Sequence, residues 1–159
     1  MTMILAIDPG LSGAYAVLWP DPARCPQVAS MPCIGQDVHP LGILGAIEPL
    51  LDGGPLAIVL EAQQAMPGQG VASTFRIGLN YGLLLGTLMH AASLHPGWSL
   101  HIVRAAAWKR AMRLSKDKEQ SRQLALLRWP QLAPQLARKK DEARAEALLL
   151  GAYWQEEHR

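Results

Sequence analysis

Short apolar runs separated by turn residues indicate several buried strands. Residues 3–7 and residues 56–60 are almost continuously apolar, which is typical of strands buried on both faces. Residues 13–18 and, more weakly, residues 27–31 are further strand candidates, and the short turns between these first runs predict an antiparallel meander. Residues 98–103 form the last predicted strand.

Apolar residues at helical spacing predict the helices. Residues 40–51 form one helix, and a longer helix runs from Ser73, a candidate N-cap, to about residue 94. Gly78, Gly82 and Gly86 recur at four-residue steps and share one face of this long helix. Each glycine lowers the stability of the helix by about 1 kcal/mol relative to alanine. Because a compensating contact would explain this cost, we expect the sheet or a partner helix to pack closely against this face.

Three further helices are predicted at residues 105–112, 118–128 and 141–154, with Pro130 and Pro134 interrupting the chain between the last two. Strands and helices in this order predict an α/β fold with a mixed sheet of about five strands flanked by helices. A chain of 159 residues suits a single domain spanning residues 1–159.

The composition excludes several classes of protein. Hydrophobic residues make up 50% of the chain and charged residues 18%, which excludes a disordered chain. The two cysteines form no CxxC pair, so a disulfide scaffold or a zinc knuckle is unsupported. The N-terminus lacks a signal-peptide pattern, and residues 82–89 are far short of the roughly 18 that a membrane span needs. We therefore expect a soluble, cytoplasmic protein without membrane association.

Charge is concentrated in one segment. Residues 1–103 contain two basic and six acidic residues, whereas residues 104–144 contain twelve basic and four acidic ones. Such a basic segment attracts nucleic acid and supplies phosphate contacts. The alternative is a pair of solvated helices.

Carboxylates follow two of the buried strands. Asp8 and Glu61 each come after five apolar residues, and strand ends in one sheet can place such groups side by side. Two like charges near 4 Å repel by about 4 kcal/mol at an effective dielectric constant of 20. Divalent cations with oxygen ligands offset this repulsion, and a two-metal site would favour phosphodiester hydrolysis.

A further acid can come from the start of the last helix. Glu142 and Glu146 lie four residues apart, on one helical face, whereas Asp141 and Glu146 are about 140° apart around an ideal helix. Asp141 or Glu142 alone is also explained as an acidic first turn that complements the helix dipole. Glu146 is the stronger site candidate because it begins the apolar run of residues 147–152.

Five motifs occur in order and cover nearly the whole chain. They are residues 6–13, Leu60-Glu61 with residues 65–73 and the glycine helix, Val103-Arg104 through Trp108-Lys109, Lys116-Asp117-Lys118 with Ser121-Arg122, and Asp141 with Glu146-Ala147-Leu148. This ordered set, which is far more specific than any one motif, resembles the RuvC-like Holliday junction resolvases of the RNase H-like superfamily. The proline-glycine-glutamine loop and the Arg144-Ala145-Glu146-Ala147 segment look most like the chloroplast-type and phage-type branch.

The resemblance implies a homodimeric, Mg²⁺-dependent endonuclease that cuts four-way DNA junctions symmetrically, without a nucleotide cofactor. It implies two ions per site, with Mn²⁺ as a substitute, and a catalytic lysine at Lys118. The spacing of the last two acids departs from the common bacterial pattern, so Asp141 and Glu142 remain alternatives. The implied acidic ligands are Asp8, Glu61, Asp141 and Glu146.

Other residues are candidates for DNA contact. Gln69 and Ser73 belong to the loop and helix start that the family places at the junction centre, and Phe75 would stack on an exposed base or lie in the core. Lys109 is a further candidate, and Trp108 fits the core better than DNA stacking. Lys139 and Lys140 are either phosphate contacts or part of a solvated face.

Three other functions compete with the resolvase interpretation. A non-cleaving junction-binding protein would need the basic segment but no acidic set. A nuclease of the same chemistry could act on RNA or on a hybrid duplex. An actin-like kinase or ATPase would need a duplicated fold and far more than 159 residues.

Overall fold

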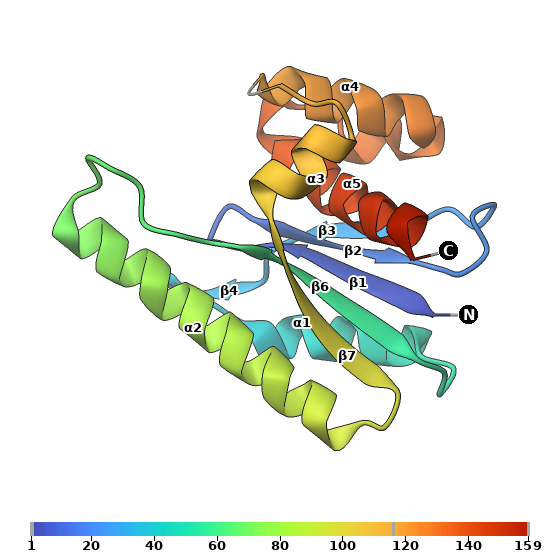
Figure 1. The fold of residues 1–159 in the computed structure, drawn as a ribbon, viewed down its shortest axis with the longest axis horizontal. Coiled ribbons are helices and arrows are strands. Elements are labelled where there is room, and N and C mark those ends of the chain that lie inside the picture. Colours follow the sequence, from blue (N-terminus) through green and yellow to red (C-terminus); the bar gives the residue numbers. More distant parts are fainter. Residues whose placement is uncertain (1, 116, 159) are drawn as a thin grey trace.

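In the computed structural model, a mixed five-stranded sheet lies between two groups of helices (Figure 1). The structure describes residues 2–115 and 117–158, except for the side chain of Lys118. The strand order is β3-β2-β1-β6-β7, with β1–β2 and β2–β3 antiparallel and β1–β6 and β6–β7 parallel. The predicted meander and mixed sheet are therefore confirmed. The strands are β1 (Met3–Asp8), β2 (Ala14–Leu18), β3 (Gln27–Ser30), β6 (Leu56–Ala62) and β7 (Trp98–Arg104).

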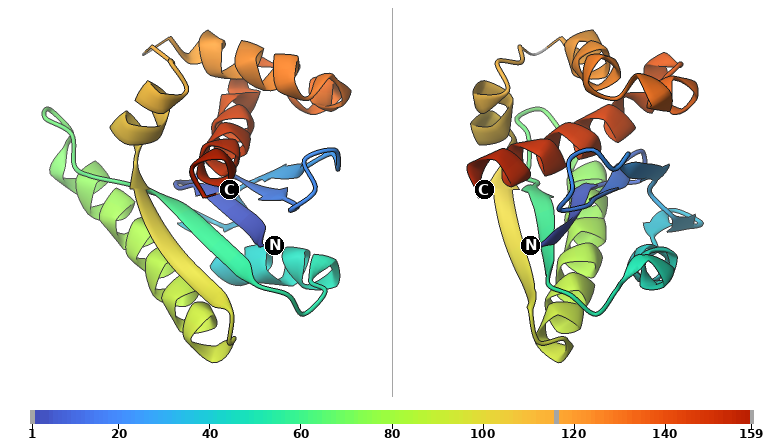
Figure 2. Two further views of the ribbon diagram at one scale, coloured as in Figure 1. Left: turned by 45° about the vertical axis from the view of Figure 1, so that its right-hand side comes forward. Right: turned by 90° about the vertical axis from the view of Figure 1, so that its right-hand side faces the viewer.

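Helix α5 (Glu142–Glu157) crosses one face of the sheet, whereas α1 (Pro40–Ile47) and α2 (Val71–Leu94) lie against the other (Figure 2). Side chains of β1 alternate between these faces, so Ala6 packs in the core with α5 while Ile7 packs with α2. A Cβ on Gly151 would lie 3.2 Å from the Cβ of Ala6. The missing side chain therefore lets α5 lie directly on the central strands.

The remaining helices differ from prediction mainly at their ends. Helices α3 (Ala105–Ala111) and α4 (Lys118–Arg128) lie close to their predicted bounds, and short 3-10 turns (Pro130–Gln135 and Lys139–Asp141) lead into α5. Another 3-10 turn (Glu48–Leu50) follows α1. The sequence did not predict the small hairpin of β4 (Cys33–Ile34) and β5 (Asp37–Val38).

Helix α2 begins at Val71 after Gly70, and no side chain caps it, so the prediction of Ser73 as N-cap is wrong. Its first half is held instead by Asn80, which is buried and accepts a hydrogen bond from the backbone N–H of Val38 at 2.8 Å. The carboxamide of Asn80 also donates to the carbonyl of Gln36 at 3.3 Å. These bonds tie α2 to the β4–β5 hairpin.

One face of α2 is not covered by the described chain. A Cβ built on Gly78, Gly82 or Gly86 would meet nothing within 4 Å, so the expectation that the sheet packs there is wrong, and packing by a partner helix stays a prediction. By length and composition alone, α2 could cross a membrane, which the short apolar run of residues 82–89 did not indicate. Buried core helices of other proteins meet the same criterion, and Leu84 and Leu88 of α2 are fully buried against the sheet.

Candidate active site

Asp8 and Glu61 lie side by side at one edge of the sheet. Strands β1 and β6 are parallel neighbours, with Ile7 opposite Leu60, so the next residue of each strand is an acid. The two carboxylates interact electrostatically, as do Asp8 and Glu146. The arrangement that the resolvase interpretation most needs, two strand-end acids facing the same space, is present.

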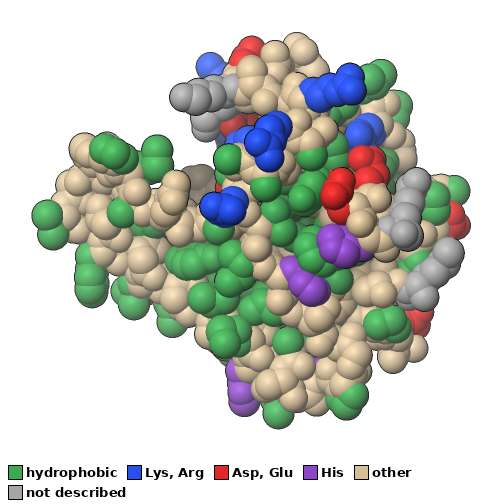
Figure 3. Space-filling view, viewed as in Figure 1, with side chains coloured by type: hydrophobic (Ala, Val, Ile, Leu, Met, Phe, Trp, Pro, Cys, Tyr) green, Lys and Arg blue, Asp and Glu red, His purple; other side chains and the backbone are tan. Residues whose placement is uncertain are grey.

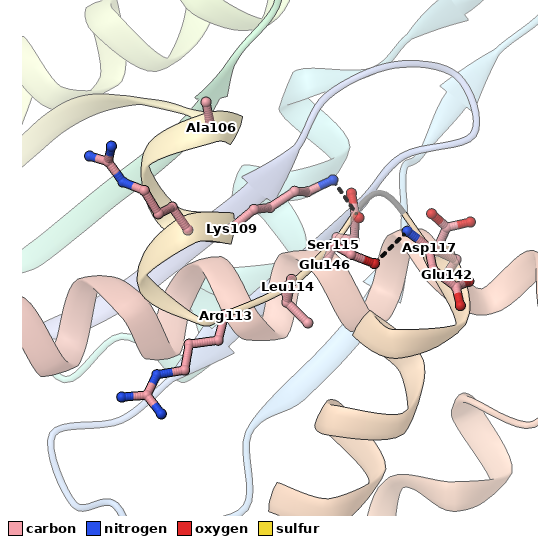
Figure 4. Close-up of a pocket in the computed structure, with 9 residues that line it drawn as sticks. Ala106, Lys109, Arg113, Leu114, Ser115, Asp117, Glu142 and Glu146 are labelled. Carbon is pink, nitrogen blue, oxygen red and sulfur yellow. Dashed lines mark hydrogen bonds and ion pairs between the residues drawn. The ribbon is translucent and has the colours of Figure 1, made fainter.

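Helix α5 adds two glutamates to this edge. Asp8, Glu142 and Glu146 line one cleft of about 460 Å³, together with the turn after β1 and with Lys140. Glu142 and Glu146 also line a second cleft of about 630 Å³, whose other wall is formed by α3 and the segment that follows it (Figure 4). The acids from β1, β6 and α5 therefore form one group, which we call the acidic cluster: Asp8, Glu61, Glu142 and Glu146.

The structure does not bring Asp141 into the acidic cluster. Its carboxylate is buried, with 3% of the residue surface exposed, and accepts hydrogen bonds from the backbone and guanidinium of Arg138. Arg144 lies 3.8 Å away as a second cation. The hydrogen bond from Arg138 lowers the pKa of Asp141 to about 2. Asp141 thus holds the start of α5, and Glu142 takes the place beside Asp8 that the sequence left open between them.

Two consecutive residues of α3 contact two members of the acidic cluster. The indole N–H of Trp108 donates to Oε2 of Glu61 at 2.7 Å, and the ammonium of Lys109 lies 2.6 Å from Oε1 of Glu146. Trp108 is fully buried, which confirms its predicted place in the core. A weaker contact comes from Ser121 of α4, whose hydroxyl donates to the same oxygen of Glu146 at 3.4 Å.

Burial and mutual repulsion disfavour the charged forms of two carboxyl groups in the acidic cluster. Burial raises the pKa of Asp8 well above its usual value, and the negative charges of Glu61 and Glu146 raise it further. Burial also raises the pKa of Glu61, although the indole N–H of Trp108 and the charge of Lys109 oppose this. Burial lowers the pKa of Lys109, but its bond to Glu146 and the surrounding acids outweigh burial, so the net change is upward. Lys109 is therefore held as a cation against the cluster.

The donor chemistry of the acidic cluster suits a hard divalent cation, because carboxylate oxygens are the ligands that Mg²⁺ and Mn²⁺ prefer. A second cation would relieve the repulsion that Lys109 only partly offsets. In the described part of the chain, however, no three His, Cys, Asp or Glu side chains converge closely enough to share one ion. Coordination of a shared ion therefore needs these carboxylates to draw closer together than they lie here.

The predicted DNA contacts are spread around this site. Phe75 is 73% exposed, so the core alternative for it is wrong. Gln69 closes its own loop by accepting a hydrogen bond from the backbone of Met66 at 3.0 Å. Ser73 lines a separate cleft of about 420 Å³ between the start of α2 and the turn after β1.

The predicted lysines have different surroundings. Lys140 is exposed and lines the cleft that holds Asp8, whereas Lys139 is exposed beside it. Lys118 begins α4, but its side chain, like the whole of Lys116, lies outside the described residues. The catalytic role of Lys118 stays a prediction.

Sequence reasoning missed the support that Trp108 gives to Glu61 and the contact of Ser121 with Glu146. No sequence signal marks the first, since a tryptophan in an apolar helix face is an ordinary core residue. The motif that contains Ser121 was the available signal for the second. The first contact depends on how α3 lies against the end of β6, and the second on how α4 packs on α5, which residue spacing alone does not give.

Of the comparisons with known proteins, only the one with solved structures identifies the fold. No family model matches the chain, and no curated protein matches it in sequence at a significant level. The fold is similar to that of T. thermophilus RuvC, solved in complex with a Holliday junction substrate, with a TM-score of 0.59 over 99% of this chain and 97% of that one. Sequence identity is 13%, so the similarity shows the fold, and the predicted RNase H-like mixed sheet is confirmed. Membership of the chloroplast-type or phage-type branch stays a prediction.

Proposed function

We propose that this protein is a Holliday junction resolvase, a structure-selective DNA endonuclease that nicks four-way junctions symmetrically. One observation supports this most directly. In a chain whose whole length shares the fold of RuvC, acids from β1, β6 and α5 gather at one sheet edge, where burial and then the neighbouring negative charges raise the pKa values of Asp8 and Glu61. Divalent cations can stabilise a group of poorly solvated carboxylates, and cations held there can in turn bind a phosphodiester.

Each residue has a role in this proposal. Two Mg²⁺ ions, or Mn²⁺ in their place, would supply an activated water and stabilise the leaving oxygen. Asp8, Glu61 and Glu146 would hold them, with Glu142 in place of Asp141 because Asp141 is occupied by Arg138.

Two residues of α3 would act on these ligands. Lys109 would hold the carboxylate of Glu146 in place until a cation is bound, and Trp108 would fix the orientation of Glu61. Lys118 would face the phosphate.

The symmetric cuts require two copies of the site, and α2 offers a surface for a second copy of this chain. Leu79 and Leu83 lie four residues apart on the face of α2 that carries the glycines and are 45% and 42% exposed. Patches of exposed apolar side chains commonly mark interaction surfaces. The bare backbone at Gly82 and its neighbours would allow the partner helix to approach closely.

Junction recognition would come from residues around the cluster. Phe75 projects from the start of α2 and would stack on an unpaired base at the crossover. Gln69 and Ser73 would contact the strands beside it, and Lys139 and Lys140 would contact phosphates.

Incubation with a mobile four-way junction and Mg²⁺, followed by mapping of both nicks, tests the proposal. We expect paired nicks at symmetric positions, no cleavage without a divalent cation, and none by the Asp8→Asn variant. A matched set of linear duplex, RNA–DNA hybrid and structured RNA serves as the control. Preferred cleavage of the hybrid or the RNA would replace the resolvase by another RNase H-like nuclease, and tight junction binding without cleavage would indicate a non-cleaving junction-binding protein.

A further inference from the structure

Three arginines around α3 have no ionic partner among the described residues. Arg104 precedes the helix, Arg110 lies in its last turn and Arg113 follows it, and all three are exposed. Each of the other arginines that the structure describes contacts a carboxylate or an aromatic ring: Arg24, Arg76, Arg122, Arg128, Arg138 and Arg144. Among the described residues, the guanidinium groups that contact neither a carboxylate nor an aromatic ring therefore all lie around α3.

Arg110 and Arg113 line the cleft of about 630 Å³ that Glu142 and Glu146 close on its other side. Figure 4 shows Lys109 extending toward Glu146, whereas Arg113 points away from the acids. Basic side chains also gather around α3 on the surface seen in Figure 3. Lys109 thus pairs with Glu146 of the acidic cluster, whereas the two arginines are available to bind an external anion.

The backbone at Arg113 is unfavourable for an arginine. Helix α3 ends in a Schellman motif, in which the N–H of Leu114 bonds to the carbonyl of Lys109 at 2.8 Å and the N–H of Arg113 to that of Arg110 at 3.0 Å. Arg113 has a φ of 57°, and no other non-glycine residue of the described chain has a positive φ. Glycine is the residue that suits this position. Strained residues of this kind concentrate at functional sites.

We propose that Arg110 and Arg113 bind DNA backbone phosphates at the rim of the acidic cleft, beside the phosphate that is cut. This inference rests on the proposed function, because it takes the anion to be nucleic acid. A guanidinium binds a phosphate through two parallel hydrogen bonds, which an ammonium cannot do. Such contacts position the strand without reading its sequence.

Arg113→Gly separates binding from stability. Removing the side chain also relieves the backbone, so we expect an unchanged or higher Tm together with weaker DNA binding. Binding of a four-way junction and of a linear duplex is measured in Ca²⁺ over a range of salt concentrations. The slope of log K against log salt should fall in magnitude by about 0.9 for each phosphate that the variant no longer binds. The double variant with Arg110→Ala should show about twice this fall.

Two further variants serve as controls. Arg113→Lys keeps the charge and should retain most of the salt slope while losing affinity through the missing second hydrogen bond. Arg24→Ala removes the same charge from the turn after β2, where Arg24 stacks on Trp19 at 3.8 Å, and should leave the slope unchanged.

The outcomes separate this inference from the proposed function. An unchanged slope for the double variant, in a protein that cuts junctions, overturns the phosphate contacts alone. A protein that binds duplex with the predicted slopes but never cuts a junction contradicts the resolvase proposal and supports the phosphate contacts. A marked fall in Tm for Arg113→Gly overturns the argument from backbone strain.

Discussion

Trp108→Phe tests whether the buried indole positions a cation ligand. The substitution removes the N–H that donates to Oε2 of Glu61 at 2.7 Å and keeps an aromatic ring in the fully buried site. Glu61 then loses a bond that favours its charged form, so its pKa, already raised by burial, moves further upward. A carboxylate that is harder to ionise and free to rotate is a weaker ligand.

The expected size of the effect follows from the charged acceptor and from the place of Trp108 beside a proposed cation ligand. A hydrogen bond to a charged acceptor contributes about 1.5–3 kcal/mol, and loss of an outer-shell partner typically costs about 10–100-fold in metal affinity. We therefore expect Mn²⁺ binding to weaken by about 10-fold or more. The smaller ring also leaves a void, so the free energy of unfolding should fall by about 1–3 kcal/mol.

Calorimetric titration with Mn²⁺ provides a readout that does not depend on cleavage, and junction cleavage is measured beside it. Trp129→Phe is the matched control. Trp129 packs against the same core, and no hydrogen bond of its indole is found in the described structure. We expect the control to lose stability while it keeps its Mn²⁺ affinity.

A folded Trp108→Phe protein that binds Mn²⁺ as the parent does would refute the reasoning. It would mean that the indole only fills space. Equal losses of affinity in the Trp108 and Trp129 variants would lead to the same conclusion, because the effect would then follow from packing.

Three other predictions concern stability and assembly. Asp8→Asn should lower cleavage more than about 100-fold. It should also raise the Tm of the metal-free protein at pH 7 in a thermal scan. The reason is that the pKa of Asp8 is raised in the folded protein, so its charge becomes increasingly destabilising as pH rises above 3.8. Asp141→Asn should lower the Tm by several degrees, whereas Glu142→Gln should lower it less and reduce cleavage. The contribution of Asp141 to stability is complete above pH 3.8 and is lost as pH falls through about 2, which thermal scans at both pH values check. Gly82→Leu should leave the Tm of the monomer unchanged or higher, because its side chain meets open space and leucine favours the helix more than glycine does. It should abolish the dimer in light scattering, and a dimer of unchanged mass would contradict the role of α2.

The sheet and two of the acids were predictable because they follow strong local patterns. Continuous apolar runs define β1 and β6, and the first polar residue after each run is Asp8 or Glu61. The strands of the β4–β5 hairpin are two residues long, too short for any period to show. Its place is set instead by Asn80, which is 42 residues away from Val38 in the sequence.

The rest of the candidate site depends on geometry at helix ends. Asp141 and Glu142 are neighbours with similar side chains, and only the structure shows that Arg138 binds Asp141. The charge of the basic segment was evident in the sequence, but its division into paired and open arginines was not. The pairing of Arg128 with Glu156 follows from how α4 packs on α5, whereas Arg122 and Arg138 pair with acids three residues away along the chain.

The acidic cluster joins the first strand to the last helix. A growing polypeptide that has reached β7 already carries Asp8 and Glu61 but has neither Glu142 nor Glu146. If the proposed chemistry holds, a ribosome-bound chain cannot cut DNA until α5 has emerged and docked on the sheet. A protease that removes α5 should likewise leave a fragment unable to nick chromosomes.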